Sequence, residues 1–116
     1  MLIANNPLLP PEGVARGPAP LPKEFALEQN FPNPFNPTTT FRYALPEGAK
    51  VRLRIYNLLG QEVKTIVDGV QEAGYHSVEW SASAMASGIY FYRLNAVSLS
   101  EPLRSFAEVR KMLLLK

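Results

Sequence analysis

The sequence predicts an all-β domain, an antiparallel β-sandwich of the immunoglobulin type with about seven strands. Three observations support this prediction. Apolar and polar residues alternate with a period of two through most of the chain after residue 24. Turns that contain glycine or proline separate these segments at intervals of roughly 8 to 12 residues, as in many sandwiches. No segment shows a convincing 3.6-residue helical period, although 83–86 could form a single turn.

The first 24 residues differ in composition from the rest. Six of the eleven prolines fall here, together with two glycines and no aromatic residue. Such a segment cannot bury enough apolar surface to offset the entropy of ordering it, so we expect 1–24 to be a flexible linker. In polyproline II form it would span roughly 75 Å. The expected organisation is therefore a proline-rich linker, 1–24, followed by one folded domain, 25–116.

The expected strands follow from the alternation of side chains. In one segment Phe41, Tyr43 and Leu45 share a face, and in the next the apolar residues of 51–56 share a face opposite two arginines. In a later segment His76 lies on the same face as its apolar neighbours. The expected strands are 25–29, 40–45, 51–56, 62–67, 75–80, 89–94 and about 106–115.

Glycines mark several of the connections between these strands. Gly60 is expected to supply a positive φ for the reversal after the third strand. Gly88 opens a strand that is apolar on both faces and is therefore expected at the centre of a sheet. Asp68 lies beside a glycine where we expect a turn. The segment 95–105 looks longer and more irregular than a short turn, which leaves the register of the last strand open.

The chain offers few residues for catalysis or for metal binding. It has no cysteine, His76 is its only histidine, and Asp68 is its only aspartate. A zinc site, a Ser-His-Asp triad, a calcium site or a pair of catalytic carboxylates would each need more such groups. We therefore expect no enzyme activity, no cofactor and no metal, and we interpret His76 as a packed or rim residue.

The net charge of +2 is far below what binding to many nucleic-acid phosphates requires. No run approaches the roughly 18 apolar residues of a transmembrane segment, and residues 1–7 lack the features of a secretory signal. The predicted partners therefore exclude nucleic acid, and no transmembrane segment is expected. We expect the chain to be the C-terminal part of a longer exported polypeptide.

The aromatic and arginine side chains each allow two interpretations. Trp80, Tyr43 and one of the pair Tyr90 and Tyr92 fall on inward positions, which favours core packing over a platform for sugar rings. The arginines are interpreted as a solvated outer sheet face, and an anionic polymer, if one binds, would be expected there. These arginines are Arg42, Arg52, Arg54 and Arg93.

Two segments have features that a generic sandwich does not require. Three prolines and two aromatic rings occupy the short stretch 30–40, which predicts a rigid loop whose Phe31 and Phe35 cap the end of the core. The second segment is the C-terminal run Lys111-Met112-Leu113-Leu114-Leu115-Lys116, four apolar residues between two lysines. Terminal residues usually fray unless they are paired, so this run needs a partner strand.

Together these segments resemble the type A C-terminal sorting domain of the type IX secretion system. The resemblance covers 25–116 and rests on the order of four motifs: FPNPFNPTTT (31–40), IYNLLGQEV (55–63), ASGIYFYRL (86–94) and KMLLLK (111–116). The middle motifs are shared with related Ig-like domains such as that of the flagellar hook-capping protein. The matching motif positions are Phe31, Pro32, Asn33, Pro34, Asn36, Pro37, Gly60, Gly88, Tyr90, Tyr92 and Arg93.

The resemblance implies a non-catalytic signal at the C-terminus of a cargo protein from a Bacteroidota-type bacterium. The cargo would reach the periplasm through an N-terminal export signal. The implied partners are the outer-membrane translocon and its shuttle protein, which read the signal, and a surface sortase, which cuts in the linker. The cargo would end at the cell surface or be secreted, and any enzyme activity would belong to the cargo.

We expect the last strand to lie at a sheet edge, with Lys111 and Lys116 as charged guards against self-association. The receptor would bind this edge by strand addition or would grip the side chains of 111–116. Two alternatives are an accessory carbohydrate-binding module and a structural Ig-like spacer of a secreted enzyme. The first alternative requires a row of exposed aromatic rings, and neither requires an apolar C-terminus.

Overall fold

The structure, a computed structural model, describes residues 20–116, which contain seven strands and no helix. The strands are β1 (Ala26–Leu27), β2 (Thr38–Leu45), β3 (Ala49–Tyr56), β4 (Glu62–Gln71), β5 (Gly74–Ser81), β6 (Gly88–Ser98) and β7 (Ser105–Leu114). The all-β class and the number of strands are as predicted. Most of the predicted linker, 1–24, lies outside the described residues.

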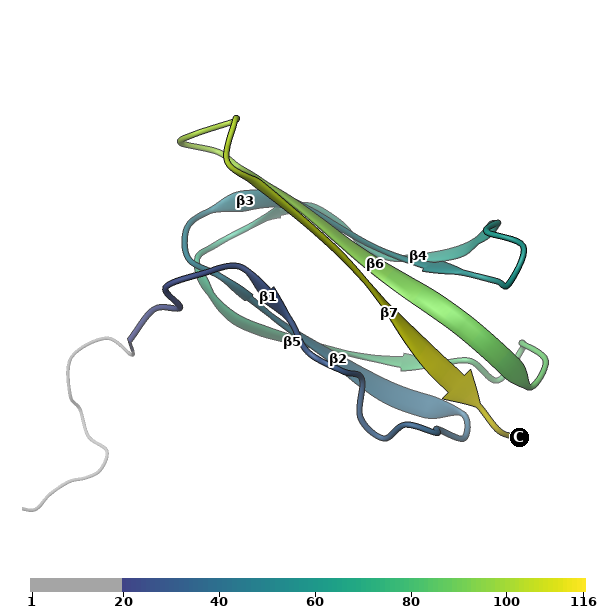
Figure 1. Ribbon diagram of the computed structural model, residues 1–116. Coiled ribbons are helices and arrows are strands. Elements are labelled where there is room, and N and C mark those ends of the chain that lie inside the picture. Colours follow the sequence, from purple (N-terminus) through teal and green to yellow (C-terminus); the bar gives the residue numbers. More distant parts are fainter. Residues whose placement is uncertain (1–19) are drawn as a thin grey trace, which may run out of the picture.

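The strands form two antiparallel sheets that pack face to face (Figure 1). One sheet has the order β1-β2-β5 and the other has the order β4-β3-β6-β7. In the constant-type immunoglobulin sandwich the fourth strand joins the sheet of the first, second and fifth strands. Here β4 pairs with β3 instead, so the larger sheet has four strands and ends at β7.

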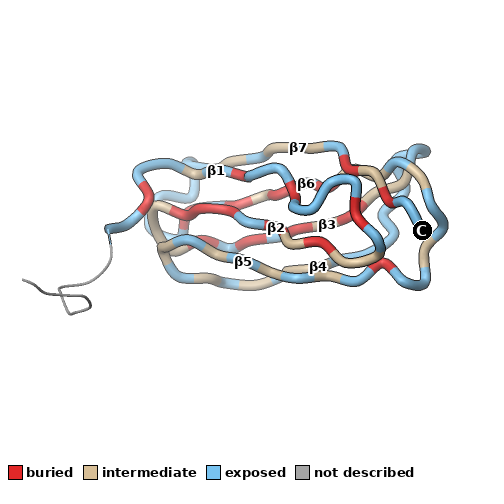
Figure 2. The backbone as a smooth tube through the Cα atoms, turned by 90° about the horizontal axis from the view of Figure 1, so that it is seen from below, coloured by how far each residue is buried: buried red, intermediate tan, exposed pale blue. Residues whose placement is uncertain are grey.

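The core lies between the two sheets and is supplied mainly by β2, β3 and β6. Phe41, Leu45, Leu53, Ile55 and Leu94 are fully buried, in agreement with the alternation predicted for β2 and β3. Figure 2 shows buried residues alternating with exposed ones along these strands, whereas β4 and β5 are intermediate or exposed throughout. The position of β6 between β3 and β7 confirms that it is a central strand.

The predicted turn at Asp68 is wrong. An Asp-Gly pair favours a tight turn, but β4 continues through both residues to Gln71, with Asp68 opposite Arg52 and Gly69 opposite Val51. Burial of the neighbouring β3 residues fixes this register, and the carboxylate of Asp68 lies 4.0 Å from Nε of Arg52. The chain leaves the sheet only after Gln71 and enters β5 of the other sheet at Gly74.

The expectation that 95–105 is a long irregular connection is also wrong. Residues 95–98 extend β6, and only 99–104 form the connection to β7. The ladder between the two strands is continuous from the pair Gly88 and Leu114 to the pair Val97 and Ser105. The register of the last strand, which the sequence left open, is therefore set by a long hairpin with a short irregular tip.

Tyr90 forms a tyrosine corner near the start of β6, a feature of many immunoglobulin-like sandwiches. Its hydroxyl donates to the carbonyl of Ala86, at 2.7 Å. This bond fastens the end of the β5–β6 connection to the sheet. The single turn expected at 83–86 lies one residue earlier, at 82–85, where the N–H of Met85 donates to the carbonyl of Ala82 at 2.9 Å.

Candidate recognition site at the C-terminal strand

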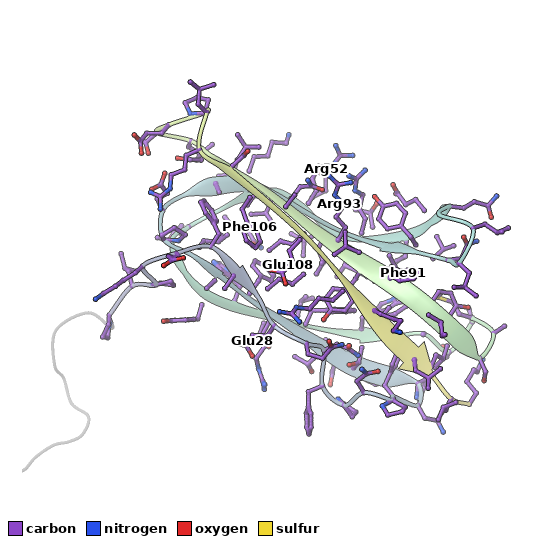
Figure 3. The ribbon with its side chains drawn as sticks, in the orientation of Figure 1. Glu28, Arg52, Phe91, Arg93, Phe106 and Glu108 are labelled. Carbon is purple, nitrogen blue, oxygen red and sulfur yellow. The ribbon has the colours of Figure 1, made fainter. Side chains whose placement is uncertain are left out.

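β7 is the edge strand of the four-stranded sheet, as predicted. In Figure 1 it is the yellow strand that leads to the C-terminus. Its side chains alternate, so that Phe106 and Glu108 lie between the two sheets whereas Arg93 of the neighbouring β6 lies on the outer side (Figure 3). The same alternation divides the C-terminal run into two sets of residues.

Two residues of the run belong to the core, because Met112 and Leu114 are 1% and 0% exposed. The other positions face outward: Leu115 is 50% exposed, Lys111 is exposed and Leu113 is half-buried. The run Lys111 to Lys116 is therefore neither wholly core nor wholly surface. The outward side chains are accessible at the surface, and the inward ones are part of the core.

The loop that contains the prolines covers the outer edge of the last residues of β7. The N–H of Phe35 donates to the carbonyl of Leu113, and the N–H of Leu115 donates to the carbonyl of Phe35, both at 3.0 Å. The side-chain oxygen of Asn33 accepts the N–H of Leu113, also at 3.0 Å. These bonds join the two segments that the sequence singled out into one structural unit.

Phe35 caps the core as predicted, but Phe31 does not. The ring of Phe35 is 2% exposed and lies 6.2 Å from the ring of Trp80. Phe31 is 69% exposed, because its backbone pairs with Thr40 in two hydrogen bonds that leave its ring outside the sandwich. The prediction is therefore confirmed for one ring and wrong for the other.

A buried asparagine holds the start of this loop. Asn30 is 2% exposed, and its side-chain amide donates to the hydroxyl of Thr39 at 3.0 Å and to the carbonyl of Pro32 at 3.2 Å. The hydroxyl of Thr39 donates to the same carbonyl at 2.9 Å. Buried polar groups with all partners present fix a single arrangement. The sequence marked this loop by its prolines, its phenylalanines and the motif 31–40, but it did not indicate a buried role for Asn30 or Thr39.

Tyr92 connects this network to the central strand β6. Its hydroxyl accepts the N–H of Asn30 at 2.8 Å and donates to the carbonyl of Glu28 at 2.7 Å. Burial raises the pKa of Tyr92 to about 12, although the bond from Asn30 and the charge of Arg110 oppose this effect. The tyrosine is thus a neutral structural link. The expectation that one of Tyr90 and Tyr92 faces inward holds for Tyr92, which is fully buried, but Tyr90 lies on the same face of β6 and also packs against the core.

The two lysines of the run have different roles. The ammonium group of Lys116 donates to the carbonyls of Ser83 and Met85, both at 2.7 Å, and its backbone N–H donates to the hydroxyl of Ser87. Lys116 therefore fastens the C-terminus to the β5–β6 connection, and its expected role as a free guard is corrected. Lys111 is exposed and forms no ion pair within 20–116.

The β7 edge is open only before Lys111, because the side-chain amide of Gln29 donates to the carbonyl of Lys111 at 2.8 Å. The backbone groups of Ser105, Ala107 and Val109 point away from β6 and have no hydrogen-bond partner within residues 20–116. Inward charges flank this stretch, since Glu108 and Arg110 form an ion pair at 2.9 Å and Arg110 donates to the carbonyl of Leu27. Inward-pointing charges are one way in which natural edge strands avoid self-pairing.

Other predicted motif positions lie around this site or shape it. Gly60 has a φ of 78° and Gly88 a φ of 152°, so both occupy conformations that favour glycine. Pro32, Pro34 and Asn36 are exposed, and the carbonyl of Pro37 accepts the N–H of Ala82 at 2.8 Å. These positions hold turns and the loop in place, and Arg93 alone among them presents an exposed charge.

The described residues bring together few groups that could carry chemistry. Within 20–116 no three residues of the types His, Cys, Asp and Glu cluster as a metal site would require. His76 stacks on Tyr43 with ring centres 5.3 Å apart, and its Nε2 lies 2.8 Å from the carbonyl of Glu72, in line with the packed role predicted for it. Over the same residues no helix is long and apolar enough to span a membrane.

The sequence suggested that the four arginines share one outer sheet face, but they do not. Arg52, Arg54 and Arg93 lie on the outer face of the four-stranded sheet, but Arg42 lies on β2 of the other sheet. Trp80 packs against the core and Tyr43 is buried within it, which agrees with the prediction of core packing. Among the described residues the largely exposed rings are Phe31 and Tyr75, on separate elements, and they form no row.

The sequence shows the family of this domain. Residues 29–102 match the family model described as the secretion system C-terminal sorting domain. The chain belongs to this family. The matched region runs from the buried asparagine network to the tip of the β6–β7 hairpin, so the resemblance to type IX sorting domains is confirmed.

The sorting domain also has a structural relative of the same fold. It is similar to part of the dimeric latent PorU from Porphyromonas gingivalis, with a TM-score of 0.60 and 23% sequence identity. The similarity covers 88% of this chain and 10% of that one, so the sorting domain spans about a tenth of PorU. A search of curated proteins gives no match.

Proposed function

We propose that this sorting domain is a non-catalytic C-terminal signal that directs a cargo protein across the bacterial outer membrane by the type IX secretion system. The observation that carries the proposal is the division of the C-terminal run. Inward residues hold the fold together, and outward residues at the same edge strand remain accessible. A signal shared by unrelated cargos must fold autonomously and must keep its recognition residues accessible to the receptor. This arrangement allows both.

The recognition element lies within Lys111, Met112, Leu113, Leu114, Leu115 and Lys116. Met112 and Leu114 act indirectly, because they fill the core and fix the strand. Lys111, Leu113 and Leu115 contact the receptor. Strand addition is restricted to 105–109, because the carbonyl of Lys111 is already bonded to Gln29 and the backbone edge of the last residues is bonded to Phe35 and Asn33. Side-chain contact is therefore the main mode of recognition at the terminus.

The partners of this signal are the outer-membrane translocon and its shuttle protein. A surface sortase then removes the domain by cutting in the linker 1–24, which separates the fold from the cargo. The domain itself passes through the periplasm, and the cargo ends at the cell surface or is secreted. Any catalytic activity resides in the cargo.

A reporter assay tests the proposal. A fluorescent protein with an N-terminal export signal is fused to residues 1–116 and expressed in a bacterium that has a type IX system. The double variant Leu113→Ser/Leu115→Ser should lose export while its melting temperature remains close to that of the parent. The matched control is Leu99→Ser/Leu103→Ser, which removes two exposed leucines at the opposite end of the β6–β7 hairpin and should be exported normally.

Each possible result of the export assay either supports or contradicts recognition through the C-terminal run. Normal export of the Leu113→Ser/Leu115→Ser fusion contradicts recognition through the C-terminal run. Loss of folding in that variant assigns both leucines to the core and also contradicts the proposal. A short tag added after Lys116 should abolish export, because it buries the outward side chains and displaces the terminal lysine.

A further inference from the structure

A second feature of the outer face has no explanation in the fold. A groove of about 310 Å³ lies beside the β3–β4 turn, with Tyr56, Leu58, Phe91, Arg93 and Val109 in its lining. These residues come from the turn and from three neighbouring strands of the four-stranded sheet. The solvated face of an antiparallel sheet is normally polar. Here Val109 is 54% exposed and apolar.

The turn itself presents two leucines to solvent. Leu58 and Leu59 are 66% and 82% exposed. The turn is held by Asn57, whose side-chain oxygen accepts the N–H groups of Leu59 and Gln61 at 2.9 and 3.0 Å, and by the positive φ of Gly60. None of these interactions uses the leucine side chains. Two apolar side chains that the turn does not need indicate an interaction surface.

The outer face of the other sheet provides an internal comparison. There Arg42 pairs with Ser77 and Thr40 pairs with Glu79 across β2 and β5, so that face is mainly polar. Both sheets belong to one small domain and meet the same solvent. Among the strand residues described, the exposed large apolar side chains lie on the sheet that carries the C-terminal strand, with Tyr75 of β5 as the exception.

The charges around the groove are unbalanced. Its nearby carboxylates are already paired, Asp68 with Arg52 at 4.0 Å and Glu62 with Arg54 at 3.5 Å. Arg93 is exposed and has no ion pair within the described part of the chain. The outward residues of β6 and β7 include Arg93 and Lys111 but no acid. A partner that carries carboxylates would complement this rim.

We infer that this groove docks a protein segment that presents apolar side chains flanked by carboxylates. The inference rests on the proposed function, because the groove is continuous with the terminal run. Phe91 lies opposite Lys111, and Ile89 lies opposite Leu113 across the β6–β7 ladder. The signal is thus read over a surface that extends from the terminal run to the β3–β4 turn, and it is not read at the tail alone.

Site-specific photocrosslinking during export tests the inference. A benzophenone amino acid replaces Leu58 or Val109 in the reporter fusion, and the control position is Tyr75, which is 72% exposed on the opposite sheet. We expect a protein crosslink from both groove positions and none from Tyr75. The crosslink should fall at least tenfold in the Arg93→Glu background. Equal crosslinking from Tyr75, or no effect of Arg93→Glu, overturns the inference.

Export of Leu58→Ser/Leu59→Ser gives an independent measurement. We expect at least a tenfold loss of export with an unchanged melting temperature. Normal export of this variant, with loss of export in Leu113→Ser/Leu115→Ser, overturns the inference that the groove docks a partner but does not contradict the proposed function. Normal export of both variants overturns both the groove inference and the proposed function. Binding of the parent domain to vesicles of anionic phospholipid or lipopolysaccharide, abolished by Leu58→Ser/Leu59→Ser, would assign the surface to a membrane and also overturn the inference.

Discussion

Phe35 and Leu114 form a parallel β-bridge that ties the proline-containing loop to the end of the last strand. The bridge uses the N–H and the carbonyl of Phe35, so the end of β7 is paired on one side with β6 and on the other with the loop. A terminus held on both sides does not fray as chain ends usually do. This relationship explains why an apolar run at the extreme C-terminus can have a fixed set of outward side chains.

The inward and outward leucines of the run should differ sharply in their contribution to stability. Leu114→Ala removes a fully buried side chain and should lower the free energy of unfolding by about 2 to 5 kcal/mol. Leu115→Ala removes a half-exposed one and should change it by less than about 0.5 kcal/mol. Urea denaturation of both variants measures the difference. Similar values would show that the register of β7 is not the one described.

Tyr92→Phe should destabilise the domain by about 1 to 3 kcal/mol. The substitution keeps the ring but leaves the N–H of Asn30 and the carbonyl of Glu28 without their shared partner in a buried site. Tyr75→Phe, at an exposed position of β5, is the matched control and should be neutral. A midpoint of urea unfolding that does not change in Tyr92→Phe would contradict the network around Asn30.

Stability should fall at high pH because of the buried tyrosines. Burial raises the pKa of Tyr92 to about 12, and it also raises the pKa of Tyr43, an effect that the hydrogen bond between the Tyr43 hydroxyl and Gln71 opposes. The unfolded chain ionises near the ordinary tyrosine value of 10.0, so the unfolded state loses protons first. The stabilising effect is therefore complete below pH 10 and is lost as the pH rises towards 12.

Urea midpoints measured between pH 8 and pH 12 check this prediction, together with the absorbance change of ionising tyrosine. Tyr92→Phe should reduce the slope of stability against pH above 10, because it removes one of the two shifted groups. A slope that is the same in the variant and the parent would assign the alkaline loss to other residues.

Asn33→Ala should open one specific hydrogen bond at the edge of β7. The variant removes the acceptor of the Leu113 N–H, and the cost should be only about 0.5 to 1.5 kcal/mol because the site is exposed. Amide hydrogen exchange followed by NMR should show faster exchange at Leu113. The amide of Leu115, which is bonded to Phe35, serves as the internal control and should keep its protection.

Deletion of residues 112–116 should unfold the domain. It removes Met112 and Leu114 from the core, each worth about 2 to 5 kcal/mol, from a fold whose total stability is expected at about 5 to 15 kcal/mol. Circular dichroism and proteolysis of the truncated chain measure the loss. A folded truncated domain would contradict the closing role of β7. Because truncation is expected to unfold the domain, recognition has to be tested with point variants and not with truncations.

Several elements were predictable from local patterns. The inward set Phe41, Tyr43 and Leu45 followed from alternation alone, because a period of two has only one way to place three apolar residues on a buried face. The reversal at Gly60 followed from the need for a positive φ. The prediction of a turn at Asp68 was wrong, because pairing of β4 with β3 outweighed the local turn preference of the Asp-Gly dipeptide.

The candidate site was predictable only in part. The loop 30–40 and the run 111–116 stand out in composition, but 70 or more residues of chain separate them, and no local pattern says that Phe35 pairs with Leu114. The same holds for Leu58 and Val109, which share a groove although they lie in different elements. Alternation could have marked the outward apolar residues of β6 and β7, but it could not show that they are adjacent.

The sequence by itself determined the class of the fold, the faces of most strands and the family, because these depend on side-chain periodicity and on motifs within short stretches of chain. The tertiary structure decided which residues of the C-terminal run are core and which are accessible, and what covers its edge. The physical reason is that burial and edge pairing depend on contacts between distant segments, and the free energy of those contacts exceeds the local preferences that the sequence displays.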